Sequence, residues 1–161
     1  MSGTIFYAEQ EGKLFIRCLG RMASSLCYHL RERINERLSR KPRVEGLFVD
    51  LCACEYMDST FLGLLVGFDK QLKREHGSRL SVVAPSAVSR QQLADLNLTE
   101  VLTILADPIP FPARLDPVSA CHSPTPELLL KAHEQLMEVS EANRKKFGAL
   151  ESLLKKKLPS S

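Results

Sequence analysis

The chain has 161 residues, of which 44% are hydrophobic and 25% are charged, and its formal net charge is +3. This length allows one ordinary domain plus an appendage, and the composition is typical of soluble globular proteins. The charge is too small to indicate nucleic-acid binding, and no apolar run approaches the roughly 20 residues of a transmembrane helix. The N-terminus lacks the basic and apolar regions of a signal peptide. We therefore expect a cytoplasmic protein that binds neither nucleic acid nor a membrane.

The five cysteines do not form a recognisable ligand set. Cys18, Cys27 and Cys52 lie among apolar residues, which suits reduced thiols in a cytosol. Cys52 and Cys54 are too close in sequence to form a zinc-binding pair, and the sequence has no Cys-x-x-Cys motif or matching pair of histidines. We expect neither a metal ion nor a cofactor.

The first third of the chain predicts two strands and a helix. Alternating apolar residues predict strands at 4–8 and 13–19, joined by a turn at Gly12. A helix is expected from Ser24 or Ser25 to about residue 40 because leucine and isoleucine recur every four positions. Its other face carries charged side chains, which we interpret as solvated: Arg31, Glu32, Arg33, Glu36 and Arg37.

Strands and helices then alternate up to residue 105. Strands are predicted at 47–51, 80–84 and 101–105, and helices at 60–76 and 86–97. Such alternation predicts an α/β fold, in which helices pack on a sheet of mostly parallel strands. Residues 52–57, which include Cys52-Ala53-Cys54-Glu55, are expected to form a loop between the strand and the helix.

The sequence changes character after residue 106 and predicts three parts. Residues 1–106 form the α/β domain, residues 107–126 are a proline-rich linker, and residues 127–158 are a C-terminal helical extension. Thr125, Pro126 and Glu127 form a strong helix start, and no proline interrupts the following residues. One unbroken helix of about 45 Å is therefore expected.

Three alternatives remain open for this C-terminal helix. It carries apolar residues at heptad spacing, among them Leu129, Leu136 and Leu150. A helix that packs back on its own domain would explain this stripe, as would an arm that self-associates or docks on a partner. The third alternative is a segment that remains disordered until it binds.

Asp58, Ser59 and Thr60 lie where the central helix is expected to begin. Residues of these types commonly cap helix N-termini, which is a sufficient explanation for them. The longer segment from Asp50 to Leu65 resembles the signature of the STAS-domain anti-sigma factor antagonists: an apolar strand ending in Asp-Leu, a short loop, an aromatic-Met-Asp-Ser-Thr turn and a helix. The resemblance extends more weakly from about residue 5 to about residue 105.

Two positions depart from that family's pattern. Phe61 stands where the family usually has glycine, and it adds an apolar group at the expected exposed start of the helix. Ala23 stands at the position at which the antagonists often carry an aspartate. The resemblance implies a STAS-like sheet with helices packed on it, and it does not cover the C-terminal helix.

The resemblance also implies a function. Ser59 would be phosphorylated by a partner that is both an anti-sigma factor and a serine kinase, and a serine phosphatase would reverse the modification. The unphosphorylated chain would bind this partner and the phosphorylated chain would release it, which is partner switching in bacterial transcription regulation. Asp58 would be a recognition or positioning residue and Thr60 a capping residue or secondary acceptor. The partner would pack over Phe61 and Leu62.

Catalysis is not expected. The sequence contains no glycine-rich phosphate loop and no Ser/His/Asp order that this fold would assemble. Its four histidines are scattered, and we interpret each as a surface residue: His29, His76, His122 and His133. An alternative to the switch is a STAS-type adaptor or scaffold subunit of a larger regulatory or transport complex, whose binding would not depend on phosphorylation.

Overall fold

The computed structural model describes residues 3–120 and 124–158. Residues 1–2, at the start of the expected domain, 121–123, within the expected linker, and 159–161 lie outside the described residues. The strands are β1 (Thr4–Gln10), β2 (Lys13–Met22), β3 (Gly46–Asp50), β4 (Cys54–Met57), β5 (Leu80–Val83), β6 (Thr103–Leu105) and β7 (Asp116–Val118). The α-helices are α1 (Cys27–Leu38), α2 (Ser59–His76), α3 (Ala87–Asp95), α4 (Pro126–Met137) and α5 (Glu141–Lys157), and Ser24–Leu26 and Leu98–Glu100 are short 3₁₀ helices.

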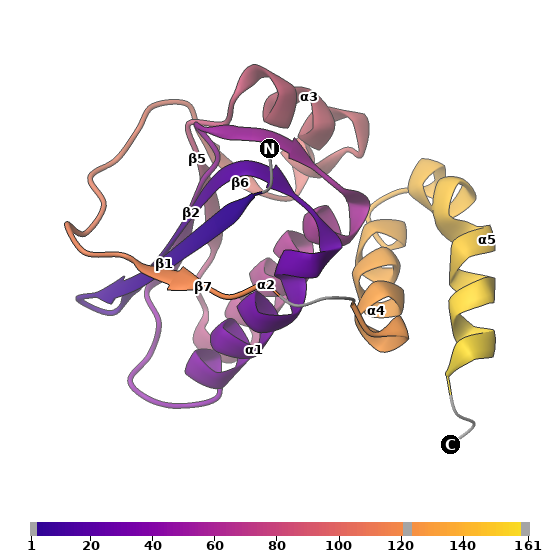
Figure 1. The fold of residues 1–161 in the computed structure, drawn as a ribbon, viewed down its shortest axis with the longest axis horizontal. Helices are drawn as coiled ribbons and strands as arrows, with labels where there is room; N and C mark the ends of the chain where they lie inside the picture. Colours follow the sequence, from indigo (N-terminus) through magenta and orange to yellow (C-terminus); the bar gives the residue numbers. More distant parts are fainter. Residues whose placement is uncertain (1–2, 121–123, 159–161) are drawn as a thin grey trace.

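The strands form one sheet in the order β6-β5-β3-β2-β1-β7, with β4 paired to β2 (Figure 1). The pairs β2–β3, β3–β5, β5–β6 and β2–β4 are parallel, whereas β1 is antiparallel to both β2 and β7. This confirms the predicted α/β fold with mostly parallel strands. The parallel pairs follow from the helical crossovers between successive strands.

Two strands were not predicted. β4 lies in the segment that was expected to be a loop, where only Cys54 and Met57 are buried, so its sequence carries little apolar signal. It pairs with β2 on both sides of an irregularity between Gly20 and Arg21, and Gly20 adopts a positive φ of 83° that favours glycine. β7 lies within the proline-rich segment and pairs with the edge of the sheet at β1.

Helices α1 and α2 pack side by side and share one core with the sheet (Figure 1). Cys18 and Cys27 are buried in this core, as expected, but Cys52 is exposed because it lies in the turn after β3. The prediction of a fully solvated charged face on α1 is wrong at Arg37, whose side chain is 1% exposed. Its guanidinium is held by the carboxylate of Glu9 at 2.7 Å from Nε, an ion pair that sequence spacing along one helix could not indicate.

The prediction of one unbroken C-terminal helix is wrong. Thr125 caps the N-terminus of α4 as expected, accepting from the N–H of Leu128, but α4 ends at Met137. Ser140 then caps α5, because its hydroxyl accepts a hydrogen bond from the N–H of Asn143 at 3.1 Å. A serine in this position starts a new helix and ends the regularity of the preceding one.

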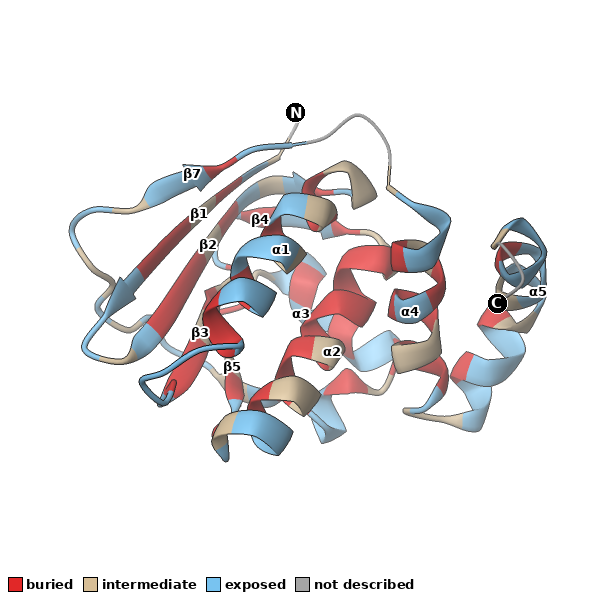
Figure 2. Cartoon of the chain, turned by 90° about the horizontal axis from the view of Figure 1, so that it is seen from below, coloured by how far each residue is buried: buried red, intermediate tan, exposed pale blue. Residues whose placement is uncertain are grey.

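The two C-terminal helices pack back on the domain, which is the first of the three alternatives. α4 lies against α2, and α5 packs on the outer side of α4 (Figure 1). Figure 2 shows buried residues on the side of α4 that faces α2, whereas α5 is mostly exposed. Leu128 and Leu136 of α4 belong to the same apolar cluster as the core of the sheet.

Candidate functional site

Asp58 caps α2 and also connects this helix to another part of the domain. One carboxylate oxygen, Oδ1, accepts a hydrogen bond from the N–H of Phe61 at 2.9 Å, and the other, Oδ2, accepts from the N–H of Ser24 at 2.7 Å. The predicted capping role is therefore confirmed for Asp58. The second hydrogen bond, which spans 34 residues, had no signal in the sequence. It holds the start of α2 against the segment that leads into α1.

Ser59 is the first residue of α2, and its hydroxyl meets the C-terminal helices. Its Oγ lies 2.7 Å from Nε2 of His133 in α4. The other ring nitrogen of His133, Nδ1, lies 2.7 Å from the carbonyl oxygen of Leu129, which can only accept. Nδ1 of the neutral ring therefore carries the proton and Nε2 accepts, so the Ser59 hydroxyl is the donor.

The expected exposure of the Ser59 hydroxyl is wrong, because α4 lies over it. Ser59 is half-buried, and the side chain that receives its hydrogen bond, His133, is only 2% exposed. Interpreting His133 as a surface histidine is likewise wrong. Its ring also lies 5.1 Å from that of Phe147 in α5, so both C-terminal helices contribute to the cover. His133 is the site residue that sequence reasoning missed. Its one signal is its position within the apolar stripe of α4.

The three residues after Ser59 are buried. Thr60 is 4% exposed, Phe61 0% and Leu62 3%. The expectation that Phe61 projects from the helix start is wrong, since Phe61, Leu65 and Phe68 share the helical face that packs into the core. Thr60 is not the cap of α2, because Asp58 has that role. Phe61 and Leu62 are not surface residues in this conformation.

The backbones of α2 and α4 approach closely at Gly63. A Cβ atom at this position would lie 2.0 Å from the carbonyl oxygen of Ala132, so only glycine fits. Gly67 follows one turn later on the same side, and a Cβ there would make ordinary contact, 3.6 Å from Cγ of Gln135. Glycine inside a helix costs about 1 kcal/mol relative to alanine, so two of them four residues apart signal a close helix–helix contact.

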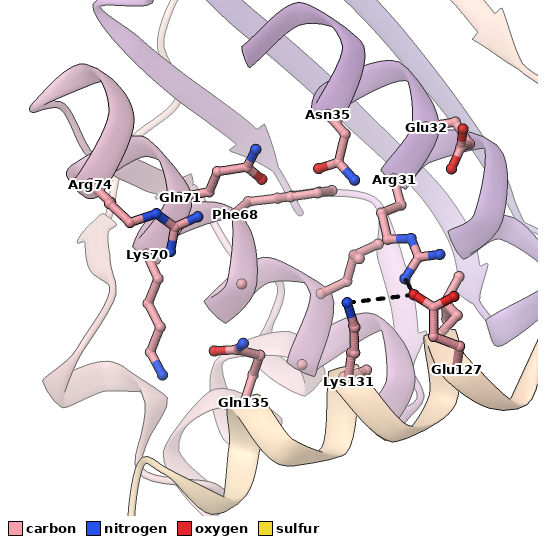
Figure 3. Close-up of a pocket in the computed structure, with 15 residues that line it drawn as sticks. Arg31, Glu32, Asn35, Phe68, Lys70, Gln71, Arg74, Glu127, Lys131 and Gln135 are labelled. Atoms are coloured by element: carbon pink, nitrogen blue, oxygen red, sulfur yellow. Dashed lines mark ion pairs between the residues drawn. The ribbon is translucent and has the colours of Figure 1, made fainter. Parts of the chain in front are cut away.

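A groove of about 510 Å³ remains between α1, α2 and α4 (Figure 3). Glu127 of α4 pairs at its rim with Arg31 of α1 at 3.8 Å and with Lys131 of its own helix at 3.5 Å. Two buried polar atoms that border this groove, Arg31 Nε and Gln135 Oε1, have no hydrogen-bond partner. The contact between α4 and the domain is therefore incompletely packed on this side.

The described residues include no group of three or more His, Cys, Asp or Glu side chains that could hold a metal ion. His29 is exposed on α1, and His122 lies outside the described residues. His76 is half-buried and accepts a hydrogen bond at Nδ1 from the N–H of Val44 at 3.0 Å. None of the helices in the described part of the chain has the length and apolar character needed to cross a membrane.

Burial raises the pKa of two thiols, Cys18 in β2 and Cys54 in β4. Desolvation raises the pKa of the Cys54 thiol, in the strand that leads to Asp58. Complete burial raises the pKa of the Cys18 thiol well above its ordinary value, and the neighbouring Cys54 and Asp50 add to the effect. Both thiols are therefore held in the protonated, unreactive form.

Comparisons with known proteins agree on the fold. The family model described as the STAS domain matches residues 7–108. An anti-sigma factor antagonist from Mycobacterium paratuberculosis superposes with a TM-score of 0.54 at 21% identity, covering 65% of this chain and 86% of that one. A putative anti-sigma factor antagonist from Thermotoga maritima gives a TM-score of 0.57 at 19% identity, covering 64% and 86%. The anti-sigma factor antagonist SpoIIAA in its unphosphorylated form gives 0.56 at 18% identity, covering 63% and 86%. No curated protein matches significantly.

Proposed function

This chain belongs to the STAS domain family, and from that premise we propose that it is an anti-sigma factor antagonist that works as a phosphorylation-controlled interaction switch. The unphosphorylated chain binds an anti-sigma factor that is also a serine kinase, in the bacterial cytoplasm. Phosphorylation of Ser59 releases this partner, and a serine phosphatase restores binding. The proposal assigns no catalytic turnover to the chain itself.

The observation that carries the proposal is the division of roles between Asp58 and Ser59. Because both oxygens of Asp58 accept backbone N–H groups, the start of α2 is held without the Ser59 hydroxyl. That hydroxyl instead makes a contact outside the helix, to His133. Modification of Ser59 therefore changes what α2 contacts while leaving its cap intact. The likeness to solved antagonists supports the fold that this assignment requires.

A phosphate at this position acts through its charge. It adds about −1.5 to −2 charges at neutral pH, and the N-terminus of α2 tolerates an anion. The neighbouring Asp58 carboxylate adds a further negative charge to that of the phosphate. A protein surface packed over this end of α2 would have to desolvate both groups, so phosphorylation blocks docking more than it destabilises the domain.

The test uses the full chain and purified serine kinases of the anti-sigma factor class from the same genome. Each kinase is incubated with the chain and ATP, the modified residue is mapped by mass spectrometry, and binding to the kinase is measured by calorimetry before and after modification. We expect phosphate on Ser59 and loss of binding. Ser86 serves as a control, because it caps α3 in the way that Asp58 caps α2. Phosphate on Ser86 with none on Ser59 would contradict the assignment of Ser59 as the phosphorylated residue.

A second candidate function is favoured by the cover over Ser59. If α4 stays in place, the chain is an adaptor or scaffold subunit of a larger regulatory or transport complex, whose contacts do not depend on phosphate. Ser59→Ala and Ser59→Asp would then bind a partner protein of that complex with equal affinity. Under the switch, Ser59→Ala binds and Ser59→Asp does not.

A further inference from the structure

We propose that the side of α2 from Ser59 to Lys70 is a helix-binding surface that α4 occupies in the unmodified chain, and that phosphate on Ser59 expels α4. The inference rests on the proposed function only for the identity of Ser59 as the acceptor. It makes α4 a competitor, within the same chain, for the surface that a partner protein needs.

The contact has the features of a specific helix-binding surface. α4 buries Leu128, Ala132 and Leu136 to 4% exposure or less. The close approach of Ala132 to Gly63 fixes the position of α4 along α2, since no side chain fits between the two backbones there. α4 also lies outside residues 7–108, which match the STAS domain, so it is an addition to the shared domain.

The hydrogen bond between Ser59 and His133 cannot survive phosphorylation. Its two atoms are 2.7 Å apart, so the space beyond the hydroxyl is filled by a buried imidazole. Phosphorylation replaces the hydroxyl hydrogen that Ser59 donates to Nε2, and three phosphate oxygens would have to occupy the space that the imidazole fills. α4 cannot move closer to α2 to compensate, because Ala132 is already in close backbone contact with Gly63 one turn away, so a bulkier group at Ser59 must push α4 outward.

The ion pair at the C-terminal end of α4 adds little to its docking. The Lys70–Glu138 ion pair has side chains that are 40% and 60% exposed, and pairs of this kind contribute roughly 0–1 kcal/mol. The unpartnered Arg31 Nε and Gln135 Oε1 atoms destabilise the docked state, since each is buried without a hydrogen bond. Asn143 holds the C-terminal helices at a second point, where its amide donates to the carbonyl of Leu96 at 3.0 Å.

Three states follow from these contacts. In the covered state α4 excludes both the kinase and any partner from Ser59. In the open, unmodified state the surface of α2 is available for binding, and the apparent affinity is reduced in proportion to the fraction of open chains. In the open, phosphorylated state α4 cannot return, and the charge at Ser59 also excludes the partner.

Hydrogen exchange of the full chain tests this inference without the kinase. Phosphoserine is placed at position 59 by nonsense suppression, and amide exchange is followed in peptides from α4 and β3. An isolated 12-residue helix is marginal in water, so released α4 should exchange about tenfold faster or more. Peptides from β3 should be unchanged, which shows that the domain remains folded.

Two glycine variants provide a matched pair. Gly63→Ala should open α4 in the unmodified chain because its methyl group would overlap the Ala132 carbonyl. Gly67→Ala, one turn along on the same helix, should keep α4 protected because its methyl group fits beside Gln135. If the β3 amides of Gly63→Ala also lose protection, Leu136→Asp replaces this variant. It places a charge at a buried position of α4 and leaves α2 unchanged.

The outcomes separate this inference from the proposed function. Continued protection of α4 in the phosphoserine-59 chain would overturn the inference, whether or not a kinase modifies Ser59. A dimer detected by light scattering, in which α4 of one copy packs on α2 of the other, would also overturn the inference. The occupant of the surface would then be a second chain. Faster exchange of α4 in a chain that no kinase modifies would support the helix-binding surface and count against the proposed function alone.

Discussion

The hydroxyl of Ser59 donates a hydrogen bond to Nε2 of His133, a residue 74 positions later in the chain. This contact joins the first residue of the central helix to a helix outside the shared domain. It shows that the residue with the strongest functional signal in the sequence is also a structural contact of the C-terminal helices. Four predictions follow from the contacts around these residues and in the core.

Ser59→Ala should weaken the docking of α4 without affecting the sheet. The substitution removes one hydrogen bond and leaves a buried imidazole nitrogen unpaired, which costs about 1–2 kcal/mol. Exchange of α4 amides should then rise by roughly five- to thirtyfold. Ser152→Ala is the control, because its exposed hydroxyl contacts only its own helix, at Gly148. Equal exchange in wild type and Ser59→Ala would contradict this prediction.

Asp58 should contribute to the stability of the whole domain through two separate hydrogen bonds. Asp58→Ala removes the cap of α2 and the connection to Ser24, with an expected loss of about 2 kcal/mol. Asp58→Asn keeps one acceptor oxygen and should lose about half as much. Urea denaturation measures both variants. Identical midpoints for the two variants would contradict this prediction, because the amide oxygen of Asp58→Asn would then preserve neither hydrogen bond.

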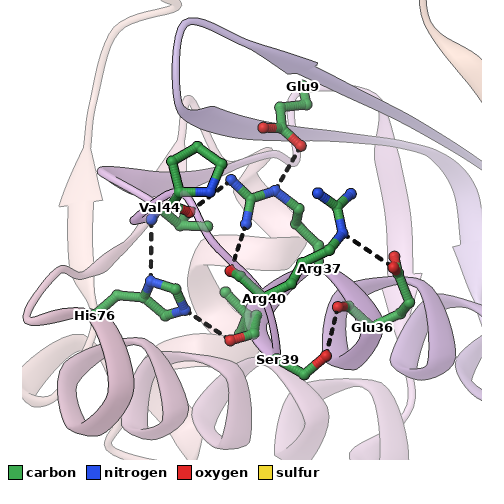
Figure 4. A network of polar contacts seen from close by, with 9 residues as sticks. Glu9, Glu36, Arg37, Ser39, Arg40, Val44 and His76 are labelled. Atoms are coloured by element: carbon green, nitrogen blue, oxygen red, sulfur yellow. Dashed lines mark hydrogen bonds and ion pairs between the residues drawn. The ribbon is translucent and has the colours of Figure 1, made fainter.

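Arg37 should be the charged residue of α1 whose loss is most destabilising. Figure 4 shows its guanidinium between Glu9 and the backbone: Nε donates to Glu9, and NH1 and NH2 donate to the carbonyls of Arg40 and Pro42. Arg37→Met should reduce the free energy of unfolding by about 3 kcal/mol, because these partners would be left unpaired. The control Arg40→Met removes an ion pair with Glu36 in which the Arg40 side chain is 53% exposed, and should cost about 0.5 kcal/mol or less.

The cysteines should differ in their reaction with iodoacetamide. Only the thiolate reacts, and burial raises the pKa of Cys18 and Cys54, so their thiolate fraction at pH 7.5 is lower than that of an ordinary thiol. Cys52 is exposed and should be alkylated first. Because burial raises the pKa of Cys18 and of Cys54, these two thiols should need a higher pH than an ordinary thiol before their alkylation becomes faster. Mass spectrometry of peptides from native and urea-unfolded protein checks this. Faster labelling of Cys54 than of Cys52 in the native chain would mean that β4 opens readily.

Local signals in the sequence were sufficient for most elements of the domain. α2 runs from Ser59 to His76 between its caps Asp58 and Gly77, close to the predicted bounds, because capping depends on residues within about four positions of the helix end. The alternation of strands and helices likewise predicted the parallel pairs. β4 and β7 escaped prediction because each is a short strand held by one neighbour, with few buried side chains.

The sequence by itself determined the STAS fold, the capped start of α2 and the position of Ser59 on it, since each depends on periodicity or on neighbouring residues. Only the tertiary structure decided that Phe61 is buried, that Arg37 is paired with Glu9 and that His133 covers Ser59. These are contacts between residues far apart in the chain, and local patterns do not record which surfaces meet. Only the folded chain showed that the backbone of α4 approaches α2 so closely at Gly63 that no side chain fits there.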